Sequence, residues 1–125
     1  MNDIIIYDTD SSEISIEHLY TIGGYATYHI SVRSGDFSGK SNFCCSIETI
    51  NSYMKQIDEM YTKLSGGIFI ADCESDAYIE FNFKGGRSIW VSGQIGGSHE
   101  AHIMRFEFMA DQIILPGLKR TLSYK

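Results

Sequence analysis

Residues 79–108 read IEFNFKGGRSIWVSGQIGGSHEAHIMRFEF, and this stretch decides the fold. It holds three segments, at 79–83, 89–95 and 104–108, in which apolar and polar residues alternate. A period of two residues places successive side chains on opposite faces of a strand. Glycine pairs between the segments favour tight turns. The stretch therefore predicts an antiparallel sheet with one polar face and one apolar face that needs a cover.

The cover is predicted to be a single long amphipathic helix at about Ile47 to Leu64. Ser46 is the expected N-cap, and the Ser-Gly-Gly run at 65–67 favours the end of the helix. Its apolar residues recur at intervals of three and four along the chain, as a helix that lies on a core requires. They are Ile47, Ile50, Met54, Ile57, Tyr61 and Leu64.

Strand bounds are predicted at 3–7, 25–33, 37–45, 68–71, 78–83 and 99–109, with a bulge at Gly39. Ile14 and Ile16 alternate only briefly. The segment after Asp111 is ambiguous and favours a short helix that starts near Pro116. We therefore expect one α+β domain over residues 1–125. It has an antiparallel sheet of about six to eight strands, covered on one face by the single long helix.

Composition restricts the partners and the location of this chain. Lys and Arg number 10 against 16 Asp and Glu, a formal net charge of −6, which repels nucleic acid and favours cationic partners. The first residues predict no export signal, and no stretch approaches the ~20 apolar residues of a membrane span. Cys44, Cys45 and Cys73 lack metal-ligand spacing and fit reduced, structural thiols. We expect a cytoplasmic protein without membrane or direct nucleic-acid contact.

Motifs that carry catalysis or bind metals are weak. His99 and His102 are three residues apart, whereas a helical zinc motif needs a spacing of four. On the predicted strand this spacing puts them on opposite faces. No G-x-S-x-G elbow marks a serine nucleophile, and acidic loops are usually solvated. The sequence therefore predicts no enzyme, no metal site and no cofactor.

Two large aromatic side chains fall on the polar face of the predicted sheet. Exposed tyrosine and tryptophan are typical interface anchors, although an N-terminal or C-terminal segment that covers them would explain them equally well. An acidic loop precedes the first of these strands and adds charge beside them. The candidate partner-binding residues are Asp72, Glu74, Asp76, Tyr78, Glu80 and Trp90.

A series of short motifs runs through residues 20–123. It includes a strand at Tyr25 to Arg33, a Phe-Ser-Gly return at 37–39, Leu-Ser-Gly-Gly at 64–67, Ala-Asp-Cys-Glu-Ser-Asp at 71–76, Arg-Phe-Glu-Phe at 105–108 and Asp-Gln with Leu-Pro at 111–116. In this order the motifs resemble the WapI-type immunity proteins of bacterial polymorphic toxin systems. The resemblance implies a small cytosolic protector that binds and blocks the toxic domain of a cognate toxin, often a nuclease. It implies no catalytic residues, and it transfers no toxin-contacting residue by position.

Two other classes of function stay open at this point. A ligand-binding module would place a pocket between sheet and helix, where His29 and His102 converge. An accessory subunit would pair its open sheet edges with a second copy, so the expected state ranges from monomer to weak homodimer.

Overall fold

The computed structural model describes residues 5–124 and consists of two four-stranded antiparallel sheets and two helices. The first sheet contains β1 (Ile5–Asp8), β2 (Ser12–Ile22), β3 (Tyr25–Ser34) and β4 (Phe37–Ser46), in that order. The second contains β5 (Gly67–Ala71), β6 (Tyr78–Phe83), β7 (Ser88–Ile95) and β8 (Met104–Asp111). Helix α1 (Ile47–Lys63) follows the first sheet, and α2 (Ile114–Leu122) follows the second.

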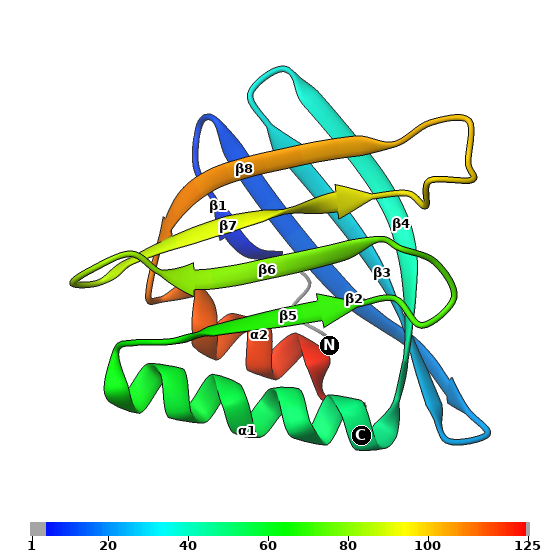
Figure 1. Ribbon diagram of the computed structural model, residues 1–125, viewed down its shortest axis with the longest axis horizontal. Coiled ribbons are helices and arrows are strands. Elements are labelled where there is room, and N and C mark those ends of the chain that lie inside the picture. The colour runs from blue at the N-terminus through cyan, green and yellow to red at the C-terminus, as the bar shows by residue number, and fades with distance from the viewer. Residues whose placement is uncertain (1–4, 125) are drawn as a thin grey trace.

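The prediction of an α+β fold is confirmed, but the prediction of one sheet of six to eight strands under one helix is wrong. The two sheets are stacked, and their strands cross (Figure 1). β4 contacts both β7 and β8, and the inward side chains of both sheets belong to one core. The apolar face of β5–β8 is therefore covered mainly by the first sheet. Alternation identifies an apolar face but not the face that it meets.

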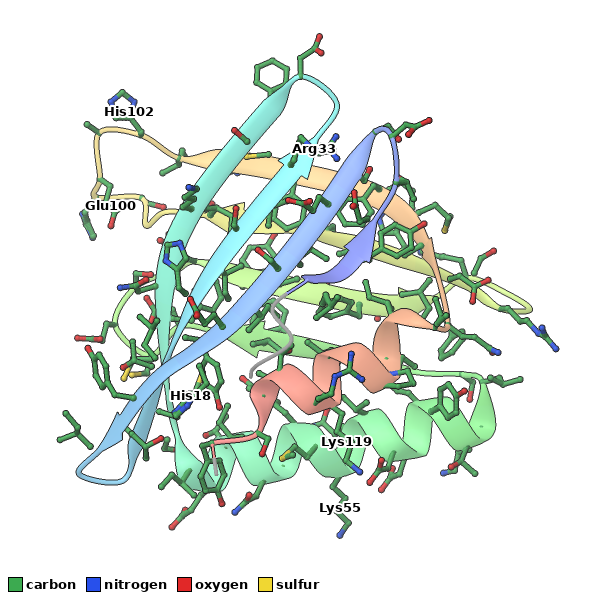
Figure 2. The ribbon with its side chains drawn as sticks, turned by 180° about the vertical axis from the view of Figure 1, so that it is seen from behind. His18, Arg33, Lys55, Glu100, His102 and Lys119 are labelled. Carbon is green, nitrogen blue, oxygen red and sulfur yellow. The ribbon has the colours of Figure 1, made fainter. Side chains whose placement is uncertain are left out.

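Both helices lie together along the open end of the two sheets (Figure 1). Helix α1 contacts α2, β4 and β5, while α2 contacts β1 and β2. Lys119 of α2 forms an ion pair with Asp58 of α1 at 2.8 Å, and Figure 2 shows Lys119 on this side of the molecule. The buried Tyr28 hydroxyl donates a hydrogen bond to the Leu122 carbonyl, which ties the end of α2 to β3. The helices close one end of the core and do not cover a sheet face.

The predicted N-cap of α1 at Ser46 is confirmed, but the helix ends at Lys63, and its left-handed cap is Leu64 instead of a residue of the Ser-Gly-Gly run at 65–67. The Ser46 side chain accepts a hydrogen bond from the Thr49 amide, and Leu64 ends the helix in the left-handed conformation at φ 53°. The buried residues are Ile50, Tyr53, Ile57 and Met60. Met54 of the predicted set is half-buried and packs against the core. Tyr53 and Met60 are buried, whereas the predicted Tyr61 and Leu64 are exposed, because α1 packs against α2 as well as against the sheets.

Several predicted strand boundaries change. Strand β8 begins at Met104 and not at His99, so His99 and His102 lie in the loop before it. Strand β2 is eleven residues long and shifts register between His18 and Tyr20. Pairing of β3 with β4 is continuous, so the bulge predicted at Gly39 is absent from the described strands.

One further element has the predicted bounds, and another begins close to the predicted position. Strand β6 has the predicted bounds, and α2 begins at Ile114, two residues before Pro116. Residues 3 and 4 of the first predicted strand lie outside the described residues. No described helix has the length and apolar character needed to cross a membrane.

Candidate protein-binding surface

The outward side chains of β5–β8 form the surface that is called the outer face below. Strand register arranges them in rows across the sheet. One row contains Tyr78, Gln94 and Arg105. The next contains Phe69, Glu80, Ser92 and Glu107, and the third contains Asn82, Trp90 and Met109. The outer face is thus a mixed aromatic and charged grid that the alternating sequence dictates.

Large apolar side chains on this face are in contact with solvent. Phe69 is 50% exposed and Met109 is 46% exposed, while Tyr78 and Trp90 are half-buried. The rings of Phe69 and Tyr78 stack with their centroids 4.9 Å apart. Aromatic and methionine side chains are enriched in protein interfaces, where a partner removes them from water. This cluster is the chemical reason to treat the outer face as a binding surface.

Neither described terminal segment, from residue 5 onward or up to residue 124, covers the two aromatics that the sequence placed on this face. Strand β1 pairs with β2 in the other sheet, and α2 packs on α1, β1 and β2. Among the described residues, no helix or strand lies over the outer face (Figure 1). The explanation that a terminal segment covers Tyr78 and Trp90 is therefore wrong for the described residues.

The centre of the opposite outer surface, on β2–β4, has a different character. Its paired positions include Glu13 with Arg33, Ser15 with Ser31, and Glu17 with His29. Figure 2 shows this side, where the Arg33 guanidinium donates to the carbonyls of Asp10 and Thr9. No phenylalanine, tyrosine or tryptophan stands in these rows, and the exposed tyrosines of this sheet, Tyr20 and Tyr25, lie at the β2–β3 hairpin end.

The charges on the outer face are mainly negative. Glu107 and Asp111 on β8 are exposed, and Glu80 on β6 is half-buried in the same row as Glu107. Arg105 is exposed, and its Nε donates to the Gln94 side-chain oxygen at 3.4 Å. Carboxylates that flank exposed aromatics favour a partner with lysine or arginine side chains, since such cations pair with both.

Asp72 does not belong to this surface, although the sequence places it among the candidates. Its side chain is 8% exposed, and its carboxylate accepts hydrogen bonds from the Cys44 amide at 2.9 Å, the Glu74 amide at 3.2 Å and the Ser75 hydroxyl at 2.7 Å. A buried carboxylate with three protein donors organises the loop between β5 and β6 and ties it to β4.

Asp76 holds two loops together. Its carboxylate accepts from the Ser98 amide at 2.7 Å, from the Ser98 hydroxyl and from the Gln94 side-chain amide at 3.4 Å. Hydrogen bonds from the Ser98 hydroxyl and amide hold the pKa of Asp76 below its ordinary value. Glu74, the third predicted acid of this loop, is exposed. Among the described residues, no hydrogen bond to its carboxylate is found.

The Asp76 contacts predict a pH-dependent stability. A lowered pKa means that these bonds stabilise the folded protein above the ordinary Asp pKa of about 3.9 and are lost as the pH falls through the lowered value. We expect Asp76→Asn to lower Tm by a constant amount above about pH 5, and by less as the pH drops below about 4. Thermal melts between pH 3 and 7 measure this difference. Glu74→Gln is the control, and a pH-independent loss in Asp76→Asn would contradict the assignment.

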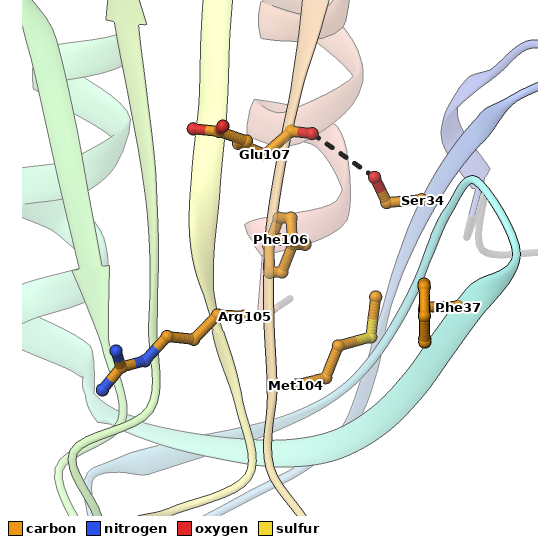
Figure 3. A pocket seen from close by; sticks show the side chains of 6 residues that line it. All are labelled: Ser34, Phe37, Met104, Arg105, Phe106 and Glu107. Carbon is orange, nitrogen blue, oxygen red and sulfur yellow. Dashed lines mark hydrogen bonds between the residues drawn. The ribbon is translucent and has the colours of Figure 1, made fainter.

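A groove adjoins the outer face along the free edge of β8 (Figure 3). Its volume is about 420 Å³, and it is lined by Ser34, Phe37, Met104, Arg105, Phe106 and Glu107. The Ser34 hydroxyl donates to the Glu107 carbonyl at 3.3 Å, and Phe37 is 73% exposed beside it. Arg105 and Glu107 belong to both the groove and the outer face. The two features therefore form one continuous region.

The cavities do not support the pocket expected of a ligand-binding module. His29 lies on the outer surface of β3 and hydrogen-bonds the Asn42 side chain at 2.8 Å, whereas His102 is exposed in the loop before β8 (Figure 2). Neither lines the groove or the two smaller cavities beside α1. The predicted convergence of these histidines is therefore wrong. In the described part of the chain, no three His, Cys, Asp or Glu side chains are grouped so that they could hold a metal.

The sequence missed three exposed apolar residues of this region. Phe69 and Met109 follow the same alternation that identified Trp90, since each lies between inward-facing neighbours. Phe37 lies at the tip of the β3–β4 hairpin, and only the packing of that hairpin beside β8 brings it to the groove.

Comparison of this chain with known proteins found no matching family model, no matching curated protein and no matching solved structure.

Proposed function

We propose that this protein binds another protein through the outer face of β5–β8 and acts as an immunity protein that blocks a toxin domain in the cytoplasm. The observation that carries the proposal is the group of solvent-exposed or half-exposed Phe69, Tyr78, Trp90 and Met109 on an uncovered sheet face. Such clusters in the middle of a polar surface supply most of the binding energy of protein interfaces.

Negative charge supports a basic partner. The chain has a net charge of −6, and Glu80 and Glu107 flank Ser92 in the central row of the face. A toxin that cleaves nucleic acid carries lysine and arginine in its substrate site, and a negative surface accelerates the approach of such a domain. Carboxylates can then occupy positions that otherwise bind phosphate. The motif order that resembles WapI-type immunity proteins supports a toxin as the partner.

The contacting residues in this proposal differ from the predicted set. Tyr78, Glu80 and Trp90 lie on the outer face, and Glu74 is exposed in the loop that precedes β6. Asp72 and Asp76 act indirectly, because their carboxylates hold that loop in place. Phe69, Arg105, Glu107 and Met109 complete the surface.

Trp90→Ala is expected to weaken binding of the cognate toxin domain by about tenfold or more. The half-buried indole offers a large apolar area that a partner can remove from water, and alanine removes this area. Isothermal titration with the cognate toxin domain measures the dissociation constant. Co-expression with that domain measures protection of growth.

Matched substitutions separate the outer face from the rest of the surface. Glu107→Lys should weaken binding and reduce its dependence on salt, whereas Glu17→Lys on the outer surface of the first sheet should change neither. Phe37→Ala removes an exposed aromatic at the hairpin tip and tests whether the groove contributes. Equal effects of Glu107→Lys and Glu17→Lys would show that only the net charge matters and would remove the outer face from the proposal.

A further inference from the structure

Two cysteine side chains from distant parts of the sequence meet at the surface. Cys44 lies near the end of β4, and Cys73 lies in the loop between β5 and β6. The Cys73 amide donates to the Cys44 carbonyl at 2.9 Å, and burial, followed by the neighbouring Cys44 thiol, raises the pKa of Cys73. Cys73 is exposed, while Cys44 is half-buried, so a dissolved reagent has access to the pair.

The third cysteine is adjacent in sequence but has a different environment. Cys45 points from the other face of β4 into the core, is 2% exposed, and its thiol donates to the Ala71 carbonyl at 3.3 Å. Burial raises the pKa of Cys45 to about 12, which keeps its thiol protonated. Cys45 is therefore a natural control for the chemistry of its neighbours.

We propose that Cys44 and Cys73 are an oxidant-responsive site that forms an intramolecular disulfide when the protein meets a low-molecular-weight disulfide such as glutathione disulfide. The backbone hydrogen bond from the Cys73 amide to the Cys44 carbonyl makes the two residues immediate neighbours, as a disulfide between them requires. The Cys44 amide also donates to the Asp72 carboxylate, so two contacts hold Cys73 and its neighbour against β4.

The reaction proceeds in two exchange steps. The exposed Cys73 thiolate attacks one sulfur of the small disulfide, forms a mixed disulfide and releases one small thiolate, which takes up a proton. The Cys44 thiolate then attacks the Cys73 sulfur, forms the Cys44–Cys73 bond and releases the second small thiolate. The two protein thiols lose two protons and two electrons, and the small disulfide is reduced to two thiols.

The environment of Cys73 determines the rate. Partial burial of its sulfur, followed by the Cys44 thiol and the carboxylates of Asp72 and Glu74, raises the pKa of Cys73 to about 11. The thiolate fraction therefore rises about tenfold for each unit of pH between 7 and 10, and the first step should accelerate in proportion. The pair thus forms its disulfide slowly at neutral pH and is not a rapid sensor.

The disulfide would tie the β5–β6 loop covalently to β4, beside the start of β6 and therefore beside Tyr78. The bond closes a loop of 28 intervening residues, since 73 − 44 = 29. Removing this conformational freedom from the unfolded chain should raise Tm by about 10 °C in the chain-entropy treatment.

The test treats the folded full-length protein with glutathione disulfide at pH 7, 8 and 9, followed by acid quenching, intact-mass measurement and peptide mapping. The expected product has lost about 2 Da, carries a 44–73 cross-link, and melts at higher temperature. Its rate of formation should rise with pH, and dithiothreitol should reverse it. Cys45→Ser should give the same product, whereas Cys73→Ser should give none.

Cys44→Ser separates the two steps of the reaction. It should stop at a glutathione adduct on Cys73, because the second attacking sulfur is missing. Three outcomes would overturn the proposal: wild-type protein that retains the adduct without the 2 Da loss, a cross-link that involves Cys45, or a loss of 2 Da in Cys73→Ser. Circular dichroism of each variant before oxidation establishes that it is folded.

Discussion

Gly93→Ala is expected to lower the free energy of unfolding by about 3 kcal/mol or more, because the centre of the second sheet leaves no room for a methyl group. A Cβ atom at Gly93 would overlap the carbonyl oxygen of Tyr78 and would lie 3.0 Å from both the Ile79 Cα and the Phe106 Cζ. The first two atoms belong to the backbone of β6, which pairs directly with β7. The clash therefore cannot be relieved by rotation of a side chain. Urea unfolding monitored by circular dichroism measures the loss.

Gly117→Ala is the matched control with the opposite expected sign. Gly117 lies within α2, where an added Cβ would meet Ile6 at 3.4 Å, an ordinary contact distance. Alanine favours a helix over glycine by about 0.5–1 kcal/mol, so this variant should be as stable as the wild type or more stable. A loss below about 1 kcal/mol in Gly93→Ala would mean that β6 and β7 separate easily and that glycine is not required.

Gly93→Ala has a second expected consequence at the surface. The methyl group presses on the Tyr78 backbone, and the Tyr78 ring belongs to the aromatic cluster with Phe69. Affinity for a partner should fall even in the fraction of the variant that stays folded. Such a fall in affinity would show that Gly93 shapes the outer face in addition to stabilising the core.

Asp72→Ala is expected to cost about 3 kcal/mol, since it removes the acceptor for three hydrogen bonds in one step. The amides of Cys44 and Glu74 and the hydroxyl of Ser75 would lose their charged partner. The site is 8% exposed, so water replaces the carboxylate poorly. Chemical unfolding gives the free energy, and amide hydrogen exchange at Cys44 reports the loss of its bond directly.

Two further variants test whether the expected loss of stability comes from the Asp72 carboxylate itself. Asp72→Asn keeps one acceptor oxygen and the side-chain volume, and it should cost less than Asp72→Ala. Glu74→Ala changes an exposed acid of the same loop and should stay within about 0.5 kcal/mol of the wild type. If Asp72→Ala were as mild as Glu74→Ala, the loop would not depend on this carboxylate.

Local pattern predicted most of the secondary structure correctly. Strand β6 has the predicted bounds because its alternation has no defect, and α1 begins after Ser46 because that side chain caps its first turn. The errors fall where the local signal is weak. Residues 96–103 are polar and glycine-rich, so the sequence offered no clear start for β8.

The arrangement of the elements could not be predicted in the same way. Alternation marks Phe81 and Ile30 as inward-facing with equal strength, and both strands then need an apolar cover. Whether that cover is a helix or a second sheet depends on long-range packing, which a periodic pattern does not encode. The long α1 was the only strong helical pattern, so it was assigned the role that the first sheet performs.

The candidate surface likewise combines residues that local pattern placed with residues whose surroundings depend on long-range contacts. Tyr78, Glu80 and Trp90 were placed correctly because a strand's period of two is local geometry. The burial of Asp72 could not be predicted, because its donor on Cys44 is 28 residues away in sequence. An acidic loop looks the same in sequence whether its carboxylates face solvent or backbone amides.

By itself, the sequence determined the strands, the long helix with its cap, the negative charge and the polar side of β6 and β7, because each follows from neighbouring residues or from composition. Only the tertiary structure decided that two sheets cover each other, that the β5–β8 face stays open, that Asp72 is internal and that Cys44 meets Cys73. These features depend on contacts between residues far apart in the chain. Their free energies come from packing and from hydrogen bonds that no local pattern records.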